Sequence, residues 1–430
     1  MRAPRATPRL RSLAVWLALT AGAIGGACDA IVGAGDRKLD TSIVCDDSGC
    51  ECATGRGDCD GEPDNGCETD LSDPEHCGAC DNVCENGACV DLACTCEGNF
   101  LECDGDPATV CETDVATSPE HCGVCGRSCA GEACAEGLCV PQPVGTVDFI
   151  YTYILVGSTV YLAAGEPGVH KMSVEGGALQ QVGNDNVYAN ALVAGGTSIY
   201  WTSPNDVRST STVTGATTVL ATPSKTWQNI AIGGGKVYWG EIDGTPANPG
   251  TMRLMRTTTA EGGTAEQVAV LGEGKYLHDF VTTTEHVYWN DITQLRRTSH
   301  EALSPQTFLE APSPPTFMTL IPEALAFAGI TSSTYLATLE DASVEQLASL
   351  PGYGPLTGDA TNVYFVTFQD GSPEATLWRV PRAGGEPFKL ATDEAPPIGA
   401  PYMATVKLAV DDTWVYWVGG ASANLFRVAK

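Results

Sequence analysis

The stretch KLAVDDTWVYWV (residues 407–418) decides the fold of the C-terminal part of this chain. It begins with an apolar segment, turns at Asp411-Asp412, and continues as a run of aromatic and β-branched residues. Such runs favour strands and Asp favours tight turns, so the stretch predicts a β-hairpin. A third apolar segment with a basic residue, Leu425 to Val428, follows it. No window after residue 140 shows a sustained helical period, so we expect strands throughout that part.

The aromatic tripeptide of this hairpin returns along the chain at intervals of 38 to 52 residues. The copies are Val160-Tyr161-Leu162, Ile199-Tyr200-Trp201, Val237-Tyr238-Trp239, Val287-Tyr288-Trp289, the weaker Leu325-Ala326-Phe327, Val363-Tyr364-Phe365 and Val415-Tyr416-Trp417. Each unit has an apolar strand before the tripeptide, a strand with a basic residue after it, and a fourth strand beyond a turn such as Gly384-Gly385. Four strands in about 40 residues are the signature of a propeller blade. We therefore predict an all-β fold with a seven-bladed β-propeller over residues 141–430.

The two ends of this region predict how the ring closes. The seventh unit reaches its third strand at Lys430, so its fourth strand must come from elsewhere. We expect Val144 to Val147, which precede the first complete unit, to supply it. A ring closed in this way leaves no long unpaired strand edge between its first and last blades.

Cysteines mark a second kind of region. All nineteen lie between Cys28 and Cys139, and eighteen of them recur with a period of 44 to 45 residues. These eighteen are Cys45, Cys50, Cys52, Cys59, Cys67, Cys77, Cys80, Cys84, Cys89, Cys94, Cys96, Cys103, Cys111, Cys122, Cys125, Cys129, Cys134 and Cys139. CETDLSDPEHCGAC from Cys67 matches CETDVATSPEHCGVC from Cys111, so residues 45–140 form a duplicated module.

Disulfide bonds explain this composition best. The module contains scattered Val and Leu with Phe100 but no Trp, Tyr, Ile or Met, so it cannot bury enough apolar surface to offset chain entropy. Cross-links, each contributing about 2–4 kcal/mol, must stabilise it instead. We predict a loop-dominated region with nine bridges among the eighteen cysteines, whose connectivity spacing alone leaves open.

Two metal sites compete with this interpretation. Cys77-x2-Cys80-x3-Cys84 beside His76, and its copy Cys122-x2-Cys125-x3-Cys129 beside His121, have zinc-like spacing. Asp58 to Gly66 gathers oxygen ligands suited to calcium without the loop spacing of an EF-hand, and the copy around Asp104 to Asp106 is poorer in carboxylates. Disulfides and solvated turns are the preferred interpretation of both segments, and we expect no cofactor or metal.

The N-terminus predicts export. Residues 1–27 combine four arginines, a short apolar run from Leu13 to Ile24, and small residues before Cys28, as in a signal peptide. Gly25-Gly26-Ala27-Cys28 resembles a bacterial lipoprotein box, although Gly25 replaces the usual aliphatic residue. The resemblance implies that Cys28 carries a lipid and that residues 28–44 form a tether. The alternative is ordinary cleavage that leaves a free thiol. We expect an exported protein of a bacterial cell envelope, lipid-anchored or secreted.

Further resemblances concern the two large regions. The PEHCGAC and PEHCGVC stretches resemble the plant stigma-specific cysteine-rich family, and DCDGEPDNGCETD is similar to cysteine-rich segments of exported myxobacterial proteins. The aromatic strands resemble the YWTD propellers of low-density-lipoprotein receptor relatives, although the residues after Tyr-Trp differ. Propellers with Val-Tyr-Trp and Arg-Val-Pro strands are also similar to exported myxobacterial proteins. These resemblances imply modules and a fold, and no activity.

The sequence favours binding over catalysis. A net charge of −30 argues against nucleic acid and against an anionic lipid surface as partners. The aromatic stripe could be a sugar-stacking surface but fits a blade core better. The recurring basic residues could ring an anionic ligand but fit ion pairs better. They are Lys171, Arg208, Arg256, Arg296, Arg379 and Arg427.

The histidines after residue 140 are His170, His278, His286 and His300, and none of them has a catalytic or metal-binding spacing; His278-Asp279 is the one pair expected near a central channel. We expect no catalytic residues and a propeller that binds a protein or a glycan, held away from the membrane by the cysteine-rich region. The alternatives are an extracellular hydrolase or lyase with its site at the channel, and a structural envelope component.

Overall fold

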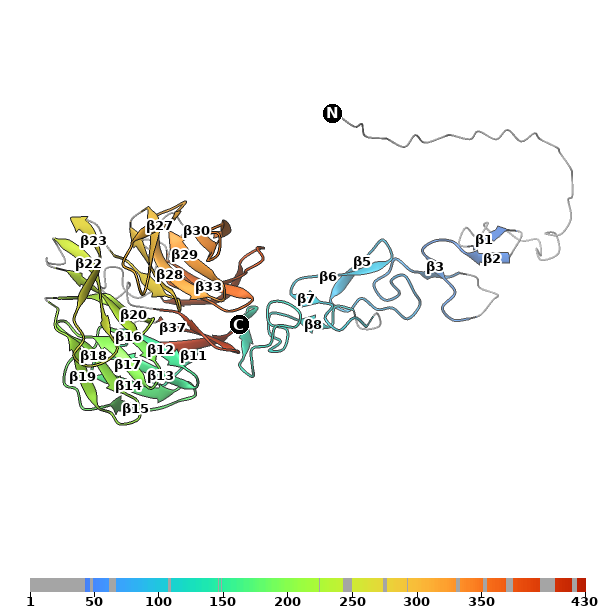
Figure 1. Cartoon of the computed structure of the whole chain (residues 1–430). Helices are drawn as coiled ribbons and strands as arrows, with labels where there is room; N and C mark the ends of the chain where they lie inside the picture. Colours follow the sequence, from blue (N-terminus) through green and yellow to red (C-terminus); the bar gives the residue numbers. More distant parts are fainter. Residues whose placement is uncertain are drawn as a thin grey trace, which may run out of the picture. The chain divides into compact units, whose positions relative to one another are not determined.

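The computed structural model shows an all-β protein (Figure 1). It describes residues 43–430 except 47–48, 62–66, 107–109, 146, 148, 224, 243–249, 274–276, 292, 330–332, 351–353, 369–373, 395–406 and 420–423. The predicted signal peptide (residues 1–27), Cys28 and most of the tether (28–44) lie outside these residues. The chain divides into two compact units, Met1–Leu71 and Ser72–Lys430. Among the residues described, no helix is long and apolar enough to span a membrane.

The first unit contains two short hairpins. Strand β1 (Ile43–Asp46) pairs with β2 (Gly49–Cys52), and β3 (Arg56–Gly57) pairs with β4 (Thr69–Asp70). The disulfide Cys52–Cys67 ties the end of the first hairpin to the second. Cys45 lies opposite Cys50 in the β1–β2 ladder, but their side chains are outside the part of the chain that the structure describes.

Disulfide bonds are present among the described cysteines, as predicted, and their pairing is duplicated. The bonds that can be traced are Cys52–Cys67, Cys77–Cys89 and Cys84–Cys94, then Cys96–Cys111, Cys103–Cys125, Cys122–Cys134 and Cys129–Cys139. Cys59 and Cys80 are disulfide-bonded as well. The sequence separations of 15, 12 and 10 residues occur in both copies. The traced bonds therefore repeat from Cys52 to Cys94 and from Cys96 to Cys139.

The second copy, residues 96–139, is called the second module below. Its strands are short: β7 (Phe100–Leu101) pairs with β8 (Thr113–Asp114), and β9 (Cys134–Ala135) with β10 (Leu138–Cys139). A hairpin of β5 (Gly87–Val90) and β6 (Ala93–Cys96) precedes it. Its interior consists largely of half-cystines, since four of its cysteines are completely or almost completely buried. They are Cys111, Cys122, Cys129 and Cys139.

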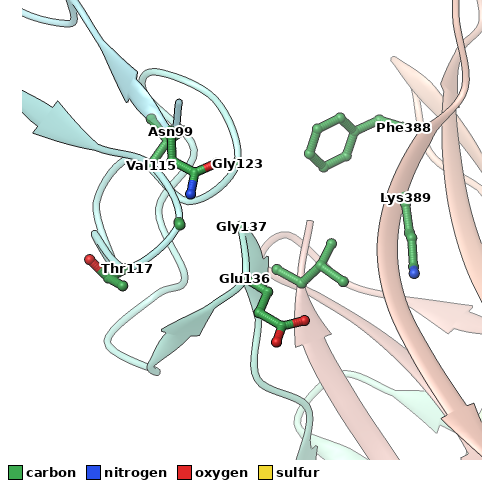
Figure 2. A pocket seen from close by; sticks show the side chains of 10 residues that line it. Asn99, Val115, Thr117, Gly123, Glu136, Gly137, Phe388 and Lys389 are labelled. Atoms are coloured by element: carbon green, nitrogen blue, oxygen red, sulfur yellow. The ribbon is translucent and has the colours of Figure 1, made fainter. Parts of the chain in front are cut away.

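The second module packs on the propeller instead of standing apart from it. Cys122, Cys129 and Cys139 share one buried cluster with Leu390 and Trp417. Phe388 projects from the propeller toward the loop of the second module that carries Gly123 (Figure 2). Gly123 has a φ of +77°, and a Cβ atom there would lie 2.4 Å from the Gly137 carbonyl oxygen and 3.3 Å from Phe388 Cζ. Only glycine fits this contact without displacement.

Seven four-stranded antiparallel sheets form the predicted propeller. Blade 1 consists of β12 (Thr152–Val156), β13 (Thr159–Ala163), β14 (Val169–Ser173) and β15 (Gly176–Val182). Blade 2 consists of β16 (Ala191–Gly195), β17 (Ser198–Thr202), β18 (Val207–Ser211) and β19 (Thr217–Ala221). Blade 3 consists of β20 (Thr226–Gly233), β21 (Lys236–Ile242), β22 (Thr251–Thr258) and β23 (Glu266–Glu273). Blade 4 consists of β24 (Phe280–Thr282), β25 (His286–Asp291), β26 (Gln294–Ser299) and β27 (Gln306–Glu310). Blade 5 consists of β28 (Pro315–Ile321), β29 (Ala324–Gly329), β30 (Ser333–Thr338) and β31 (Val344–Ser349). Blade 6 consists of β32 (Leu356–Gly358), β33 (Asn362–Phe368), β34 (Glu374–Pro381) and β35 (Phe388–Glu394). Blade 7 is β36 (Ala409–Val410), β37 (Trp414–Gly419), β38 (Asn424–Ala429) and β11 (Gln142–Pro143).

The ring closes, but by a different segment from the one expected. The first strand of each blade contacts the first strand of the next, and β12 contacts β36, which completes the circle. The closing strand is Gln142–Pro143 and not Val144 to Val147. Val144 still donates its N–H to the Leu425 carbonyl oxygen at 2.8 Å, and Gly145 at φ +76° then turns the chain toward blade 1. The pairing therefore ends where the chain must leave for its next blade.

All seven aromatic tripeptides lie on the second strand of a blade and are buried. Three of their tyrosine hydroxyls form hydrogen bonds inside the protein: Tyr416 donates to Asp411 Oδ2 at 2.8 Å, Tyr364 to Asp359 Oδ2 at 3.0 Å, and Tyr238 lies 2.7 Å from His300 Nδ1. Buried aromatics contribute the largest apolar areas of a core. The stripe is thus core, and the sugar-stacking alternative is wrong for these rings.

The carboxylate of Asp359 is expected to stabilise the folded protein in a way that is lost at acidic pH. Burial alone would raise its pKa, but the N–H groups of Thr361 and Asn362 and the Lys430 ammonium at 3.0 Å hold the pKa of Asp359 well below its usual range. A depressed pKa stabilises the native state above the pKa of the unfolded chain, about 3.9, and this stabilisation is lost as the pH falls further.

We therefore expect Asp359→Asn to cost about 1 kcal/mol at neutral pH, since the side chain is partly exposed. The difference from the wild type should shrink between pH 5 and pH 3 in urea unfolding followed at several pH values. Asp412→Asn on the neighbouring turn is the control. A cost that stays constant over this range would contradict the assignment.

Candidate functional site

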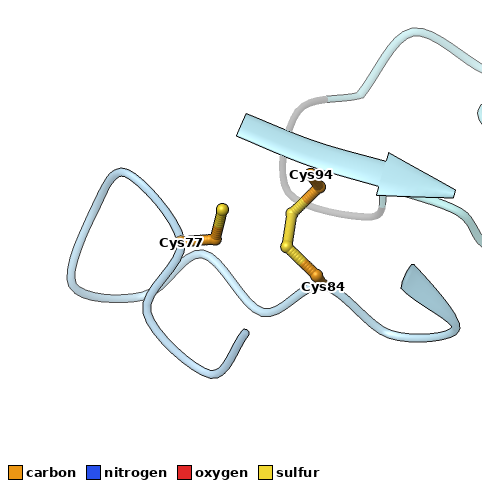
Figure 3. Close-up of side chains that lie close together, drawn as sticks. All are labelled: Cys77, Cys84 and Cys94. Atoms are coloured by element: carbon orange, nitrogen blue, oxygen red, sulfur yellow. A yellow bond between two sulfur atoms is a disulfide. The ribbon is translucent and has the colours of Figure 1, made fainter. Parts of the chain in front are cut away.

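The zinc-like cysteine clusters are disulfides. Cys77 lies beside the Cys84–Cys94 bridge, and its own partner is Cys89 (Figure 3). Sulfur atoms in disulfides are not the thiolates that zinc requires. The neighbouring histidines are bound to backbone: His76 Nδ1 lies 2.5 Å from the Cys80 carbonyl oxygen, and His121 Nδ1 accepts the Gly126 N–H at 3.1 Å. The zinc interpretation is therefore wrong for these cysteines.

The two copies of the cysteine-rich module present similar carboxylate groups. One consists of Asp58, Asp60 and Glu68, and the other of Glu102, Asp104 and Glu112, with one oxygen of each residue within 4.8 Å of the others. The copy around Asp104, which seemed poorer in carboxylates, matches the first because Glu102 and Glu112 fold back to it. Glu68 and Glu112 accept the N–H groups of equivalent cysteines at 3.0 Å. All six lie toward solvent, as expected of carboxylates in a very acidic chain, and their geometry assigns no ion.

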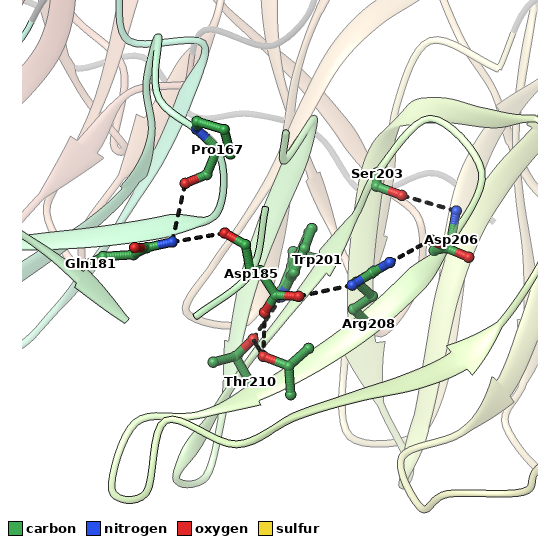
Figure 4. A network of polar contacts seen from close by, with 9 residues as sticks. Pro167, Gln181, Asp185, Trp201, Ser203, Asp206, Arg208 and Thr210 are labelled. Carbon is green, nitrogen blue, oxygen red and sulfur yellow. Dashed lines mark hydrogen bonds and ion pairs between the residues drawn. The ribbon is translucent and has the colours of Figure 1, made fainter. Parts of the chain in front are cut away.

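Most of the recurring basic residues form ion pairs, as expected. Arg208 binds Asp185 at 2.8 Å and Asp206 at 2.7 Å, and its guanidinium carbon lies 5.3 Å from the centre of the Trp201 ring (Figure 4). Asp185 also accepts the Thr217 hydroxyl. Arg256, Arg296 and Arg427 pair with Glu266, Asp291 and Glu175. These arginines connect strands and adjacent blades, and they do not form a ring around a ligand.

One face of the propeller gathers polar residues at the axis. The inner strands of all blades begin at this face, which we call the entry face. The inner-strand residue opposite the last tripeptide residue is Ile230 in blade 3 and Phe280 in blade 4. Asn229 and Asp279 each come one residue before these positions. In blade 7 the strand register places Lys407 at the equivalent position. Three blades thus carry polar side chains at one level of the central channel.

Asp279 connects three consecutive blades. Its Oδ1 accepts the Phe280 N–H at 2.9 Å and the Asn229 side-chain amide of blade 3, and its Oδ2 accepts the Met318 N–H of blade 5 at 2.9 Å. Burial raises the pKa of Asp279, and the Lys407 charge and the hydrogen bonds oppose that shift. Both carboxylate oxygens are therefore used to hold blades together.

Lys407 completes this group from across the ring. Its Nζ lies 3.4 Å from Asn229 Oδ1, although blades 7 and 3 are not neighbours. The two side chains can meet only inside the central channel. Asn229, Asp279 and Lys407, called the axial cluster below, therefore occupy the channel at this level.

The predicted pair His278-Asp279 is divided between two environments. Asp279 belongs to the axial cluster, whereas the His278 side chain is exposed on the entry face. The other histidines of the propeller are buried or half-buried; His300 bonds to Tyr238 and to the Thr283 carbonyl oxygen. Within the described part of the propeller, no three metal-ligating side chains come together.

Two exposed aromatic rings precede the inner strands of blades 1 and 2, at the entry face. Phe149 is 56% exposed and Tyr188 49% exposed. They hold equivalent positions in blades 1 and 2, four residues before the inner-strand residues Tyr153 and Leu192, which pair with the last residues of their tripeptides. Phe149 has a φ of +54°, a rare conformation for a bulky residue and one that often marks functional loops. Sequence patterns missed both, because they lie outside the repeating tripeptides.

Comparisons with known proteins add the fold alone. No family model and no curated protein matches this chain. An oligogalacturonate lyase in complex with manganese matches with a TM-score of 0.54 and 13% identity, over 66% of this chain and 89% of its own. The oligogalacturonate lyase of Vibrio parahaemolyticus gives 0.51 and 13%, over 66% and 90%. The Cps50 (Swd1) β-propeller domain of Myceliophteria thermophila gives 0.50 and 9%, over 68% and 100%.

Proposed function

We propose that this chain is an exported, lipid-anchored envelope protein whose propeller binds a protein or a glycan at its entry face without catalysing a reaction. The observation that carries the proposal is the pair of exposed rings, Phe149 and Tyr188, at equivalent positions of adjacent blades. Rigid aromatic side chains are typical anchors of recognition surfaces. The many disulfide bonds support export to an oxidising compartment. An acyl chain on Cys28, measurable by mass spectrometry of the N-terminal peptide, is the part of the proposal that concerns anchoring.

The axial cluster supports binding over catalysis. A general base in the channel needs a carboxylate oxygen that can accept a proton from a substrate. Both oxygens of Asp279 already accept hydrogen bonds from Asn229, Phe280 and Met318. The hydrolase or lyase alternative would therefore need other residues, and it is kept as an outcome of the test below.

The test compares two double variants of the full chain on glycan arrays and in capture assays with envelope proteins. Phe149→Ala/Tyr188→Ala should weaken binding of the wild type's ligand by about tenfold or more, the usual effect of losing anchor residues. Val219→Ala/Val270→Ala removes equally exposed side chains from the outer strands β19 and β23 and should leave binding unchanged. Equal binding by both variants would refute the proposed face, and release of shortened glycans would establish the enzyme instead.

A further inference from the structure

A cavity lies where the second module meets blade 6, well away from the axial cluster. Its volume is about 530 Å³, within the range of small-molecule sites. Val115 of the second module and Phe388 of β35 provide apolar walls (Figure 2). Leu138 of the second module adds a third. Both sides belong to the same compact unit, Ser72–Lys430.

Three polar side chains at this cavity have no partner among the residues that the structure describes. Asn99 and Glu136 line it from the second module, and Lys389 lines it from β35. None of them forms a hydrogen bond or ion pair with another described side chain. Apolar walls with a few unpaired polar groups are the usual lining of a ligand site.

Two arginines give the cavity a positive environment. The guanidinium carbons of Arg127 and Arg379 lie 4.9 and 5.2 Å from the centre of the Phe388 ring. Arg127 is only 5% exposed, and its Nε and Nη2 have no partner in the described part of the chain. Neither arginine forms an ion pair with a described carboxylate. Burial and the charge of Arg379 lower the pKa of Arg127 to about 10, so it stays charged at neutral pH.

The charge balance of this corner is the reverse of that of the protein. Lys389 lines the cavity, Arg127 and Arg379 lie over the Phe388 ring that forms one of its walls, and Glu136 is the one carboxylate in the lining, in a chain of net charge −30. Arg127 is a buried cation without a counter-ion among the described carboxylates, which is costly, and an anion that enters the cavity would relieve that cost. The charge of this region therefore favours an anionic ligand.

We propose that this cavity binds a small organic anion with an apolar body, such as a carboxylate or sulfonate. The acid group faces Lys389 in the positive field of the two arginines, and the apolar body lies against Val115, Leu138 and Phe388. Glu136 and Asn99 accept or donate hydrogen bonds at the opposite rim. The site is separate from the entry face and does not depend on the function proposed for that face.

Fluorescence titration of the full chain with two dyes of similar shape tests the charge requirement. Anilinonaphthalene sulfonate carries the acid group, and phenylnaphthylamine has the same aromatic rings without it. The sulfonate should bind at least about tenfold more tightly, the effect of one charge-assisted contact. Equal affinity for the two dyes would overturn the proposal, because the cavity would then select apolar surface alone.

Two variants with opposite expected signs locate the binding. Lys389→Met should weaken sulfonate binding about tenfold, and Glu136→Gln should strengthen it by removing the one like charge near the ligand. Both side chains are at the surface, so neither change threatens folding. Lys236→Met in blade 3 is the matched control and should bind as the wild type does. If Lys389→Met binds like that control, or if Glu136→Gln fails to tighten binding, the proposed site is wrong.

Discussion

Asp279→Ala is expected to destabilise the propeller by about 3–5 kcal/mol, as the removal of one partner from a buried charged network usually does. The substitution leaves the amides of Phe280 and Met318 and the side chain of Asn229 without their acceptor. It also removes the carboxylate charge that interacts with the Lys407 ammonium. Because these groups belong to blades 3, 4, 5 and 7, the loss affects most of the ring at once.

Urea unfolding followed by tryptophan fluorescence measures this effect, because Trp201, Trp239 and Trp289 are fully buried. Asp279→Asn keeps one acceptor oxygen and the shape of the side chain, so it should cost less than Asp279→Ala. Asp412→Ala, on the exposed turn before β37, should change the midpoint little. An Asp279→Ala midpoint equal to that of the Asp412→Ala control would show that the axial cluster does not hold the blades together.

Removing the Cys129–Cys139 bridge by the double substitution to alanine is expected to lower the stability of the propeller as well as that of the second module. The bridge closes a loop of sequence separation 10, which alone contributes about 2–4 kcal/mol. Both half-cystines also lie in the buried cluster that contains Leu390 and Trp417 of blades 6 and 7. Loss of this contact should expose Trp417 and shift the unfolding of the ring.

The repeat supplies a matched control for this prediction. Cys84–Cys94 is the equivalent bridge of the first copy, with the same sequence separation of 10, and it is not part of the cluster shared with the propeller. Its removal should leave the tryptophan transition of the ring almost unchanged. Equal shifts in that transition for the two double variants would mean that the second module is not part of the propeller's core.

The sequence predicted the blades because each blade repeats one buried hairpin. The tripeptides all lie on second strands, even the weak copy Leu325-Ala326-Phe327, since a strand between two neighbours in a stacked blade must be apolar on both faces. The cysteine period likewise predicted a duplicated, disulfide-bonded region. These features depend on local pattern and are visible without any knowledge of long-range contacts.

The features that position function depend on contacts between distant segments. Asn229 and Lys407 meet only because the ring brings blades 3 and 7 face to face across the channel. The cavity joins residues near position 120 to residues 388 and 389, a pairing that no spacing indicates. The closing strand was misplaced for a similar reason, since Gln142–Pro143 is too short to have a strand pattern of its own. Exposed Phe149 and Tyr188 lie outside the repeats and left no periodic signal.

The central feature of this fold is the closure of a seven-bladed ring by the segment that precedes its first complete blade. Amide hydrogen exchange at Val144, whose N–H bonds to the Leu425 carbonyl oxygen at 2.8 Å, tests this most directly. In a closed ring, the Val144 amide is expected to exchange as slowly as amides inside the blades, through opening of the whole ring. Exchange of Val144 at the rate of a free chain, with β38 as an open edge, would contradict it.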